Sequence, residues 1–355
     1  MYRRLIPLLF VLCLPARAQN LNSWELQGEY GFLFLHSEEV RPIGQSYPFG
    51  LGLSYSRWML KEKNWKNCHC YPRWGISLNY HNYDNAEILG WGLPLYGFLE
   101  PQYRLFGNFF FTLRGGAGYT WLSNPYDSET NPLNVSYSLP LTPFVMLGTG
   151  FSWHLNPHWR VGAQLRYSHA SNGGLQQPNK GLNYPTVAMG VDYSVKAADF
   201  KPRTKAPVAR EDMRESLSLS AFAAGKAIDS TRVTYAVPGL ELKYSRQVGR
   251  VSALVGGVEW ISNLAYREVI RQYNTGEDHN QLGLLLGHEF LMGNFTFTQL
   301  AGVYLYKDFD VKPDWYQRYG LTWHPFDHFY AGSQIKVHGH VAEFLDFRLG
   351  YRYTF

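Results

Sequence analysis

The sequence predicts an all-β fold, a transmembrane antiparallel β-barrel, and three observations support this. Aromatic residues make up 17% of the chain, with 26 Tyr, 22 Phe and 11 Trp, and membrane barrels place aromatic girdles at both interfaces. Segments of alternating polar and apolar residues recur at intervals of roughly ten to fifteen residues, as a meander of strands requires. Beyond the first residues, no stretch approaches the roughly twenty apolar residues of a membrane helix.

The first eighteen residues have the pattern of a secretory signal. Arg3 and Arg4 precede the apolar run Leu5–Leu14, and Ala16-Arg17-Ala18 offers a small-residue cleavage site. The run is too short to span a bilayer as a helix. Residues 1–18 are therefore predicted to be a signal peptide, with Cys13 an ordinary residue of its apolar core.

The last strand alternates in the manner of a membrane barrel. Its apolar face consists of Leu345, Phe347, Leu349, Tyr351, Tyr353 and Phe355. A final strand ending in Phe resembles the signal by which bacterial outer-membrane barrels are recognised for insertion. The mean hydropathy of −0.28 agrees, because lumen-facing polar residues offset the lipid face. A bacterial outer-membrane location is predicted, although a strand of a soluble sandwich alternates similarly.

Strand signals divide the chain into two halves. In the first, residues 19–196, they lie near 24–36, 49–60, 71–82, 89–103, 108–121, 141–153, 158–171 and 185–196. Residues 197–215 are charged, contain two prolines and lack a period of two, which indicates a linker. In the second half, residues 216–355, strand signals lie near 217–225, 239–247, 250–260, 279–290, 294–305, 315–323, 328–341 and 344–355.

The two halves resemble each other, which indicates an internal duplication. Gly150-Phe-Ser-Trp-His154 returns as Gly320-Leu-Thr-Trp-His324 at an offset of 170, whereas the final strands match at an offset of 160. Two tandem eight-stranded barrels and one barrel of about sixteen strands both fit this pattern. The long charged linker favours two barrels, because connections between hairpin strands are usually short.

Neither the charge nor the cysteine content of the chain indicates nucleic-acid binding or a zinc site. The net charge of +5 comes without a concentrated basic run, so nothing indicates nucleic acid. Cys68 and Cys70 could form a disulfide or bind a metal, but their spacing is tight for a bridge and no second cluster completes a zinc site. Two incidental loop thiols are the favoured interpretation.

The seventh strand of the first half carries the candidate chemistry. Alternation places His169 and Ser171 with Leu165 and Tyr167 on one face, and Arg166 with its polar neighbours on the other. Because a small barrel is polar inside, the His169 face should be the lipid face. Counted from a periplasmic N-terminus, this strand runs outward, so the pair should lie at the outer leaflet. Their Cα atoms should be roughly 6.5 to 7 Å apart, close enough for an imidazole to activate a serine hydroxyl.

The run His169-Ala-Ser171-Asn172-Gly-Gly-Leu-Gln-Gln-Pro-Asn179-Lys-Gly-Leu-Asn183 resembles the signature of the lipid A 3-O-deacylases. That family consists of eight-stranded outer-membrane barrels that remove the 3-linked hydroxyacyl chain of lipid A. The resemblance implies Ser171 as nucleophile, His169 as general base, Asn172 as an oxyanion contributor, lipid A or lipopolysaccharide as the partner, and no metal or other cofactor. Gly173, Gly174 and Gly181 are expected to shape the loop.

Asn183 departs from the family pattern, which usually has glutamate at this position. Asparagine can accept the imidazole N–H and fix the tautomer, but it cannot stabilise the imidazolium by charge. A comparable change in a serine protease lowers kcat by about four orders of magnitude. Weak activity, an unusual substrate and no activity all remain open at this point.

The remaining histidines are predicted to be structural. In the second half, Gly339 and Val341 stand at the positions of His169 and Ser171, so this copy should be chemically inactive. A metal site from His338, His340 and Asp346 is an alternative to a polar lumen network, which is favoured. The histidines that flank two turns are expected to be interfacial polar residues: His154, His158, His324 and His328.

The sequence thus favours an ester hydrolase acting on lipid A or a related outer-leaflet glycolipid, with the second barrel structural or binding a partner. The alternative is a non-catalytic barrel, structural, binding or porin-like, that retains the motif.

Overall fold

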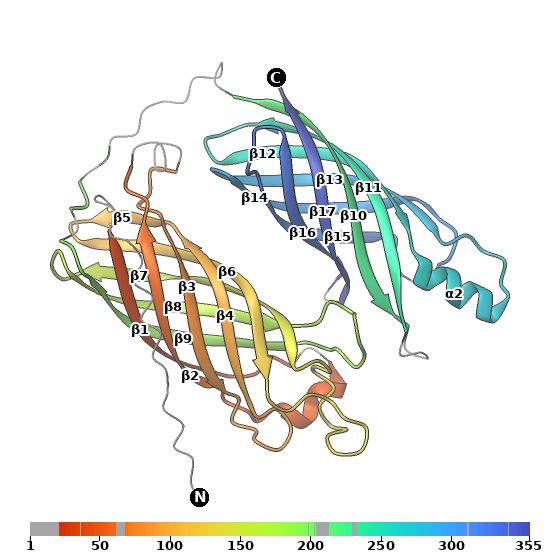
Figure 1. Cartoon of the computed structure of the whole chain (residues 1–355), viewed down its shortest axis with the longest axis horizontal. Helices are drawn as coiled ribbons and strands as arrows, with labels where there is room; N and C mark the ends of the chain where they lie inside the picture. Colours follow the sequence, from red (N-terminus) through yellow and green to blue (C-terminus); the bar gives the residue numbers. More distant parts are fainter. Residues whose placement is uncertain are drawn as a thin grey trace, which may run out of the picture.

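The computed structural model describes residues 21–355 except 36, 62–67, 198, 202, 204–212, 229–232, 311 and 340. The predicted signal peptide, most of the linker and His340 lie outside the described residues. Two closed antiparallel barrels lie side by side, each formed by one half of the chain (Figure 1). No described helix is long and apolar enough to cross a membrane.

The first barrel has eight strand positions around its ring, because two of its nine strands share one position. Its strands are β1 (Asn22–Gly31), β2 (Phe49–Trp58), β3 (Arg73–Asn82), β4 (Trp91–Glu100), β5 (Gln102–Phe106), β6 (Phe109–Leu122), β7 (Leu141–His154), β8 (Trp159–Ala170) and β9 (Leu182–Ser194). Strands β4 and β5 both pair with β6, so together they occupy one strand position, which is interrupted at Pro101. Pairing of β1 with both β2 and β9 closes the ring. A 3₁₀ helix, η1 (Glu38–Ile43), follows β1.

The second barrel consists of eight strands. Its strands are β10 (Glu215–Ala227), β11 (Thr234–Gln247), β12 (Ser252–Ser262), β13 (Asn280–Met292), β14 (Phe295–Lys307), β15 (Trp315–Trp323), β16 (Phe329–His338) and β17 (Val341–Thr354), with α2 (Leu264–Tyr273) after β12. Pairing of β10 with β17 closes the ring. The alternative of one barrel of about sixteen strands is therefore wrong, because each half satisfies its own edge strands.

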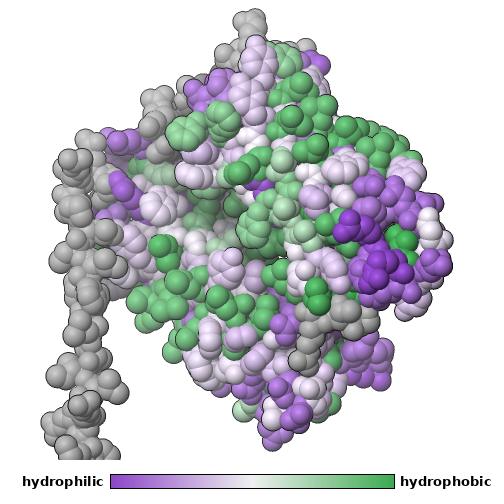
Figure 2. All heavy atoms as spheres, turned by 45° about the vertical axis from the view of Figure 1, so that its right-hand side comes forward, coloured by the Kyte–Doolittle hydropathy of each residue, from purple (hydrophilic) through white to green (hydrophobic). Residues whose placement is uncertain are grey.

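Alternation along the strands separates an apolar wall from a polar lumen. On β1, the side chains of Trp24, Leu26 and Tyr30 are 48%, 63% and 60% exposed, whereas Glu25 and Gln27 are buried. Figure 2 shows hydrophobic side chains over much of the visible wall and hydrophilic ones gathered on the projecting loops. This is the division expected of a barrel whose outer surface faces lipid.

Ion pairs fill both lumens. In the first barrel, Arg114 binds Glu25 at 2.6 Å and also contacts Glu100. In the second, Arg318 binds Glu259 and Asp346 at 2.7 and 2.6 Å. A lumen cavity in the first barrel measures about 20 Å³, which is room for a water molecule. Side chains thus occupy the space that a porin would leave as a channel.

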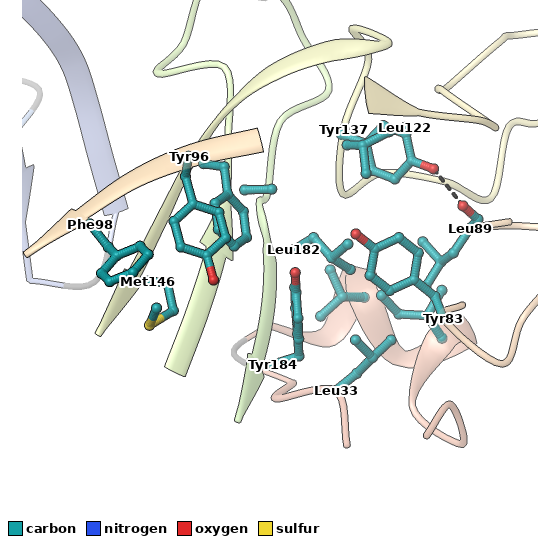
Figure 3. Packing of buried hydrophobic residues seen from close by; sticks show 14 residues of the cluster. Leu33, Tyr83, Leu89, Tyr96, Phe98, Leu122, Tyr137, Met146, Leu182 and Tyr184 are labelled. Carbon is teal, nitrogen blue, oxygen red and sulfur yellow. Dashed lines mark hydrogen bonds between the residues drawn. The ribbon is translucent and has the colours of Figure 1, made fainter. Parts of the chain in front are cut away.

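An apolar cluster closes the end of the first barrel that carries η1, called here the η1 end. Tyr83, Tyr137, Leu182 and Tyr184 belong to this cluster, and the Tyr137 hydroxyl donates to the Leu89 carbonyl at 2.7 Å (Figure 3). Leu182 and Tyr184 flank Asn183 on β9. The cluster therefore gives the strand ends around the motif a rigid support.

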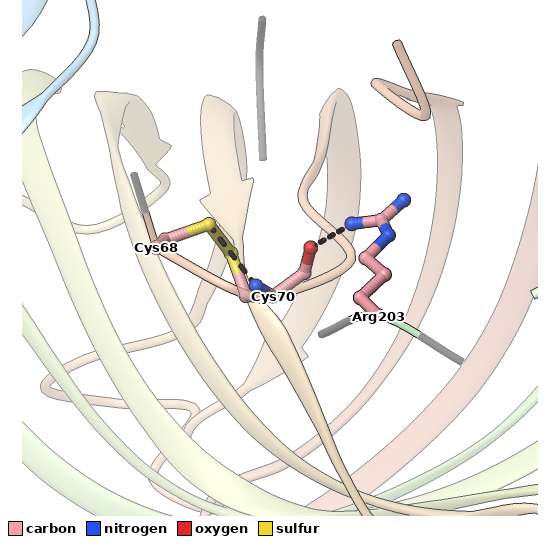
Figure 4. Close-up of a disulfide and its surroundings, with 3 residues drawn as sticks. All are labelled: Cys68, Cys70 and Arg203. Carbon is pink, nitrogen blue, oxygen red and sulfur yellow. Dashed lines mark hydrogen bonds between the residues drawn. A yellow bond between two sulfur atoms is a disulfide. The ribbon is translucent and has the colours of Figure 1, made fainter. Parts of the chain in front are cut away.

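Cys68 and Cys70 form a disulfide near the opposite end, which corrects the interpretation of two incidental thiols. Their Cα atoms are 5.1 Å apart, within the range that a disulfide bridges. Arg203, from the segment after β9, donates to the Cys70 carbonyl (Figure 4). The part of the predicted linker around Phe200, Lys201 and Arg203 therefore packs on the first barrel near the disulfide.

His154 is also placed differently from the prediction. It was expected at the interface, but its side chain is buried and its ring stacks on Phe110, with centroids 4.0 Å apart. Phe200, from the same segment as Arg203, packs against both rings. These aromatic contacts bury most of the His154 side chain at this end of the barrel.

The lumen ion pairs predict unequal stability effects for two arginines. Arg318→Met leaves the buried carboxylate of Glu259 without its arginine and removes one of the two arginines that pair with Asp346. We therefore expect it to lower the free energy of unfolding by about 3–5 kcal/mol. Arg246→Met is the control, because Arg246 pairs with Glu215 at 3.5 Å and is 67% exposed, and such pairs contribute little. Urea unfolding in phospholipid vesicles, followed by tryptophan fluorescence, measures both. Equal effects would contradict the assigned role of the lumen pairs.

Candidate active site

His169 lies on the outer wall of the first barrel, as alternation predicted. On β8, Leu165 and Tyr167 are 64% and 43% exposed, whereas Arg166 and Ser168 are buried in the lumen. His169 pairs in register with Asn183 of β9. The barrel wall itself therefore holds the imidazole and its neighbour on the apolar surface.

Asn183 is the hydrogen-bond partner of His169. The His169 Nδ1 atom lies 2.6 Å from Asn183 Oδ1, which also accepts from the Tyr167 hydroxyl at 3.0 Å. An amide oxygen only accepts, so the imidazole carries its proton on Nδ1. Its Nε2 lone pair is then the one suited to take a proton from a nucleophile.

Ser171 follows the last residue of β8 and is 8% exposed. Its backbone N–H donates to the Pro143 carbonyl at 3.2 Å. Its Oγ atom accepts from Asn179 Nδ2 at 2.9 Å and from the Gly173 N–H at 3.3 Å. Two donors therefore converge beside the oxygen that would attack an ester.

The Asn172 side chain differs from the prediction of an oxyanion donor. Its Nδ2 donates to the Gln176 carbonyl at 2.8 Å and to Ser138 Oγ at 3.2 Å, and its Oδ1 accepts from the Gly174 N–H at 3.0 Å. These bonds keep the amide inside the loop. In this structure Asn172 holds the turn together, and Asn179 has the amide directed at Ser171.

Positive φ angles explain the glycines of the loop. Gly173, Gly174 and Gly181 have φ of +65°, +86° and +83°, where a side chain is strained. A Cβ on Gly181 would also come within 2.9 Å of His169 Cε1. The glycines thus shape the loop as expected, and Gly181 additionally leaves space for the imidazole.

Sequence reasoning did not find the roles of Asn179 and Tyr167. Tyr167 shares the strand face of His169, so the two-residue period could have suggested it. Asn179 is eight positions after Ser171 in an irregular loop, and only the folded loop brings their side chains together.

The second barrel lacks an equivalent pair. Gly339 has φ of +64° and Val341 is 49% exposed, at the positions that correspond to His169 and Ser171. His338 is buried, with its Nδ1 3.6 Å from Glu343, and Asp346 pairs with Arg318 and Arg348. Among the described residues, no group of three or more His, Cys, Asp or Glu side chains is arranged to hold a metal.

Fold and surface together define a class of protein, an outer-membrane type of β-barrel with a polar lumen and an apolar outer wall. Residues 49–192 match the family model described as lipid A 3-O-deacylase. Residues 215–355 match the model described as acyloxyacyl hydrolase, C-terminal domain. The first of these matches confirms the resemblance to the lipid A 3-O-deacylases seen in the motif. That family is one of hydrolases.

Several solved structures match the chain, among them the following three. Neisserial surface protein A is 10% identical with a TM-score of 0.35, covering 48% of this chain and 96% of that one. The outer membrane enzyme PagL is 18% identical with a TM-score of 0.33, covering 47% and 97%. A Rhodopseudomonas blastica porin mutant is 7% identical with a TM-score of 0.21, covering 94% and 100%. No curated protein matches the chain.

Proposed function

We propose that this protein hydrolyses an acyl ester of lipid A, or of a related outer-leaflet glycolipid, in the bacterial outer membrane. The observation that carries the proposal is the bond between His169 and Asn183 on the outer wall, with Ser171 two residues after His169, just past the end of β8. A base oriented by a hydrogen-bond acceptor, next to a serine, is the arrangement of nucleophilic ester hydrolysis.

The reaction proceeds in two steps. Ser171 Oγ attacks the ester carbonyl carbon while His169 Nε2 takes the hydroxyl proton. The tetrahedral intermediate expels the sugar oxygen, which receives that proton, and leaves an acyl-serine. Water then attacks the acyl-serine with His169 again as base. The products are the free fatty acid and the glycolipid alcohol, and Ser171 is restored.

Asn179 and the backbone of the glycine turn supply the oxyanion donors. Asn179 Nδ2 and the Gly173 N–H both point at Ser171 Oγ, which is bonded to the carbonyl carbon in the intermediate. The developing negative charge therefore forms within reach of both donors. Both donors bond to Oγ here, and turning them to the neighbouring oxyanion would stabilise its charge.

The position of the site suits a substrate embedded in the membrane. Val145 and Leu147 on β7, and Leu165 on β8, are 47%, 65% and 64% exposed near His169, and a lipid acyl chain can lie along this surface. If the η1 end faces outward, the ester of an outer-leaflet lipid lies level with Ser171. The substrate then reaches the serine without leaving the bilayer.

A non-catalytic barrel is the second candidate, and Asn183 is the observation that favours it. A neutral amide orients His169 but leaves the imidazolium without a neighbouring negative charge at this position. A barrel that binds a glycolipid at this wall without cleaving it would keep the same hydrogen bond.

Replacement of Ser171 tests the proposal directly. Detergent-refolded protein is incubated with lipid A, and acyl loss is followed by mass spectrometry. We expect the wild type to release one hydroxyacyl chain and Ser171→Ala to release none, because the alanine cannot form the acyl-serine. Heat-modifiable gel mobility verifies that the variant is folded. Equal release by both proteins would contradict the proposal, and no release by either favours the non-catalytic barrel.

Asn183→Glu restores the charge that the family pattern includes. The carboxylate would accept the same Nδ1–H bond and stabilise the imidazolium, so we expect kcat to rise, by up to about four orders of magnitude. Asn183→Gln is the control, because it has the length of glutamate without the charge. The rate of acyl release is measured for the wild type and both variants. A rate in Asn183→Glu no higher than in Asn183→Gln would show that the missing negative charge does not limit catalysis.

Two asparagines in the loop distinguish oxyanion binding from loop structure. Asn179→Ala removes a donor at Ser171, and we expect kcat to fall about 10²- to 10³-fold with KM little changed. Asn172→Ala breaks the bonds that hold the turn, so it should lower the thermal stability of the loop and reduce kcat less. Steady-state kinetics of acyl release measures both. A larger loss of kcat in Asn172→Ala than in Asn179→Ala would indicate that Asn172, and not Asn179, binds the oxyanion.

A further inference from the structure

The turn that follows Ser171 contacts the second barrel. We propose that the end of this barrel near α2 is a positioning element of the Ser171 site; this rests on the function proposed above. The contacting residues of the turn are Gly173, Gly174 and Leu175. The second barrel, which lacks the Ser–His pair, would thus contribute to catalysis without touching substrate.

Two hydrogen bonds attach the turn to the second barrel. The Gly174 carbonyl accepts from the backbone N–H of Ala227 at 2.9 Å. The Leu175 carbonyl accepts from Thr234 Oγ1 at 3.0 Å. Ala227 is the last residue of β10 and Thr234 the first of β11, so both donors lie on the rim of the closed barrel.

Packing against the same rim is close. A Cβ on Gly173 would come within 3.0 Å of Leu345 Cβ, and one on Gly174 within 3.1 Å of the Glu343 carbonyl oxygen. A Cβ on Gly225 would come within 2.8 Å of Leu175 Cδ2. Gly173 and Gly174 are buried, although connecting segments normally lie on the surface.

The residues that touch the second barrel are those that organise the site. The Gly173 N–H donates to Ser171 Oγ, and the Gly174 N–H donates to Asn172 Oδ1. A shift of the turn therefore moves a donor relative to the nucleophile. Displacements of about 1 Å in such groups can cost on the order of 10²-fold in rate.

The second barrel has room for the turn because its own equivalent connection is short. In the first barrel β8 ends at Ala170 and β9 begins at Leu182, whereas β16 ends at His338 and β17 begins at Val341. The fall in offset from 170 to 160 between the two halves marks this missing segment. The turn of the first barrel packs beside the start of β17, next to Glu343 and Leu345.

Gly225→Leu tests the proposal in the full chain. The new side chain would displace Leu175, so we expect kcat for acyl release from lipid A in detergent micelles to fall about ten- to a hundredfold. KM should stay within about twofold, because the exposed wall below His169 is unchanged. Ala221→Leu is the matched control, since Ala221 is an exposed residue on the same strand and face, away from the turn.

Leu175→Ala in the Gly225→Leu background supplies a rescue. Removing the displaced side chain makes space for the new leucine, so kcat should recover by several fold. Thr234→Val is a milder variant that keeps the volume and removes one donor, and it should lower kcat less than Gly225→Leu. A general loss of folding would not be reversed by Leu175→Ala, so the rescue separates positioning from misfolding.

Amide hydrogen exchange at residues 173–175 measures the contact between the turn and the second barrel, and it does not depend on enzymatic activity. We expect faster exchange in Gly225→Leu than in Ala221→Leu. An active wild type, with Gly225→Leu matching Ala221→Leu in both kcat and exchange, overturns this inference alone. A wild type that releases no acyl chain overturns the proposed function and, with it, the catalytic role of the second barrel.

Discussion

Satisfaction of backbone hydrogen bonds within the membrane is the constraint on which this structure depends. A strand edge exposed to hydrocarbon leaves its N–H and C=O groups without partners, so a membrane sheet must close. Each half of the chain meets this condition by itself, through β1 with β9 and through β10 with β17. Closure then fixes which residues face lipid and which face the lumen, and the charged lumen residues find partners there.

The same closure creates the site. Because β8 and β9 are neighbours in the ring, His169 and Asn183 are paired across the ladder although they are separated by a loop. Alternation turns both toward lipid, where a membrane-embedded ester would be accessible. The loop between the strands then folds back so that Asn179 and Gly173 donate to Ser171. Ladder geometry thus places the proposed base and its partner, and loop geometry places the proposed oxyanion donors.

Local periodicity explains how much of this was predictable from the sequence. A period of two is a property of each strand alone, so the face of His169 followed directly, and the motif spacing gave Asn183. Other features depend on tertiary contacts of irregular segments, which local periodicity does not describe. They are the hydrogen bonds of Asn179, the hydrogen bonds of the Asn172 amide within the loop, and the contact of Leu175 with Thr234. The disulfide of Cys68 and Cys70 was missed because spacing alone does not give the turn that brings two cysteines within 5.1 Å.

Under the proposed mechanism, Ser171, just past the end of β8, is a nucleophile activated by His169. The most direct measurement is covalent labelling of the refolded full chain with a serine-reactive fluorophosphonate, followed by peptide mass spectrometry. We expect an adduct on Ser171 that is lost in His169→Ala while the barrel stays folded. Hydrolysis of lipid A by a protein whose Ser171 takes no label, or equal labelling in His169→Ala, would contradict it.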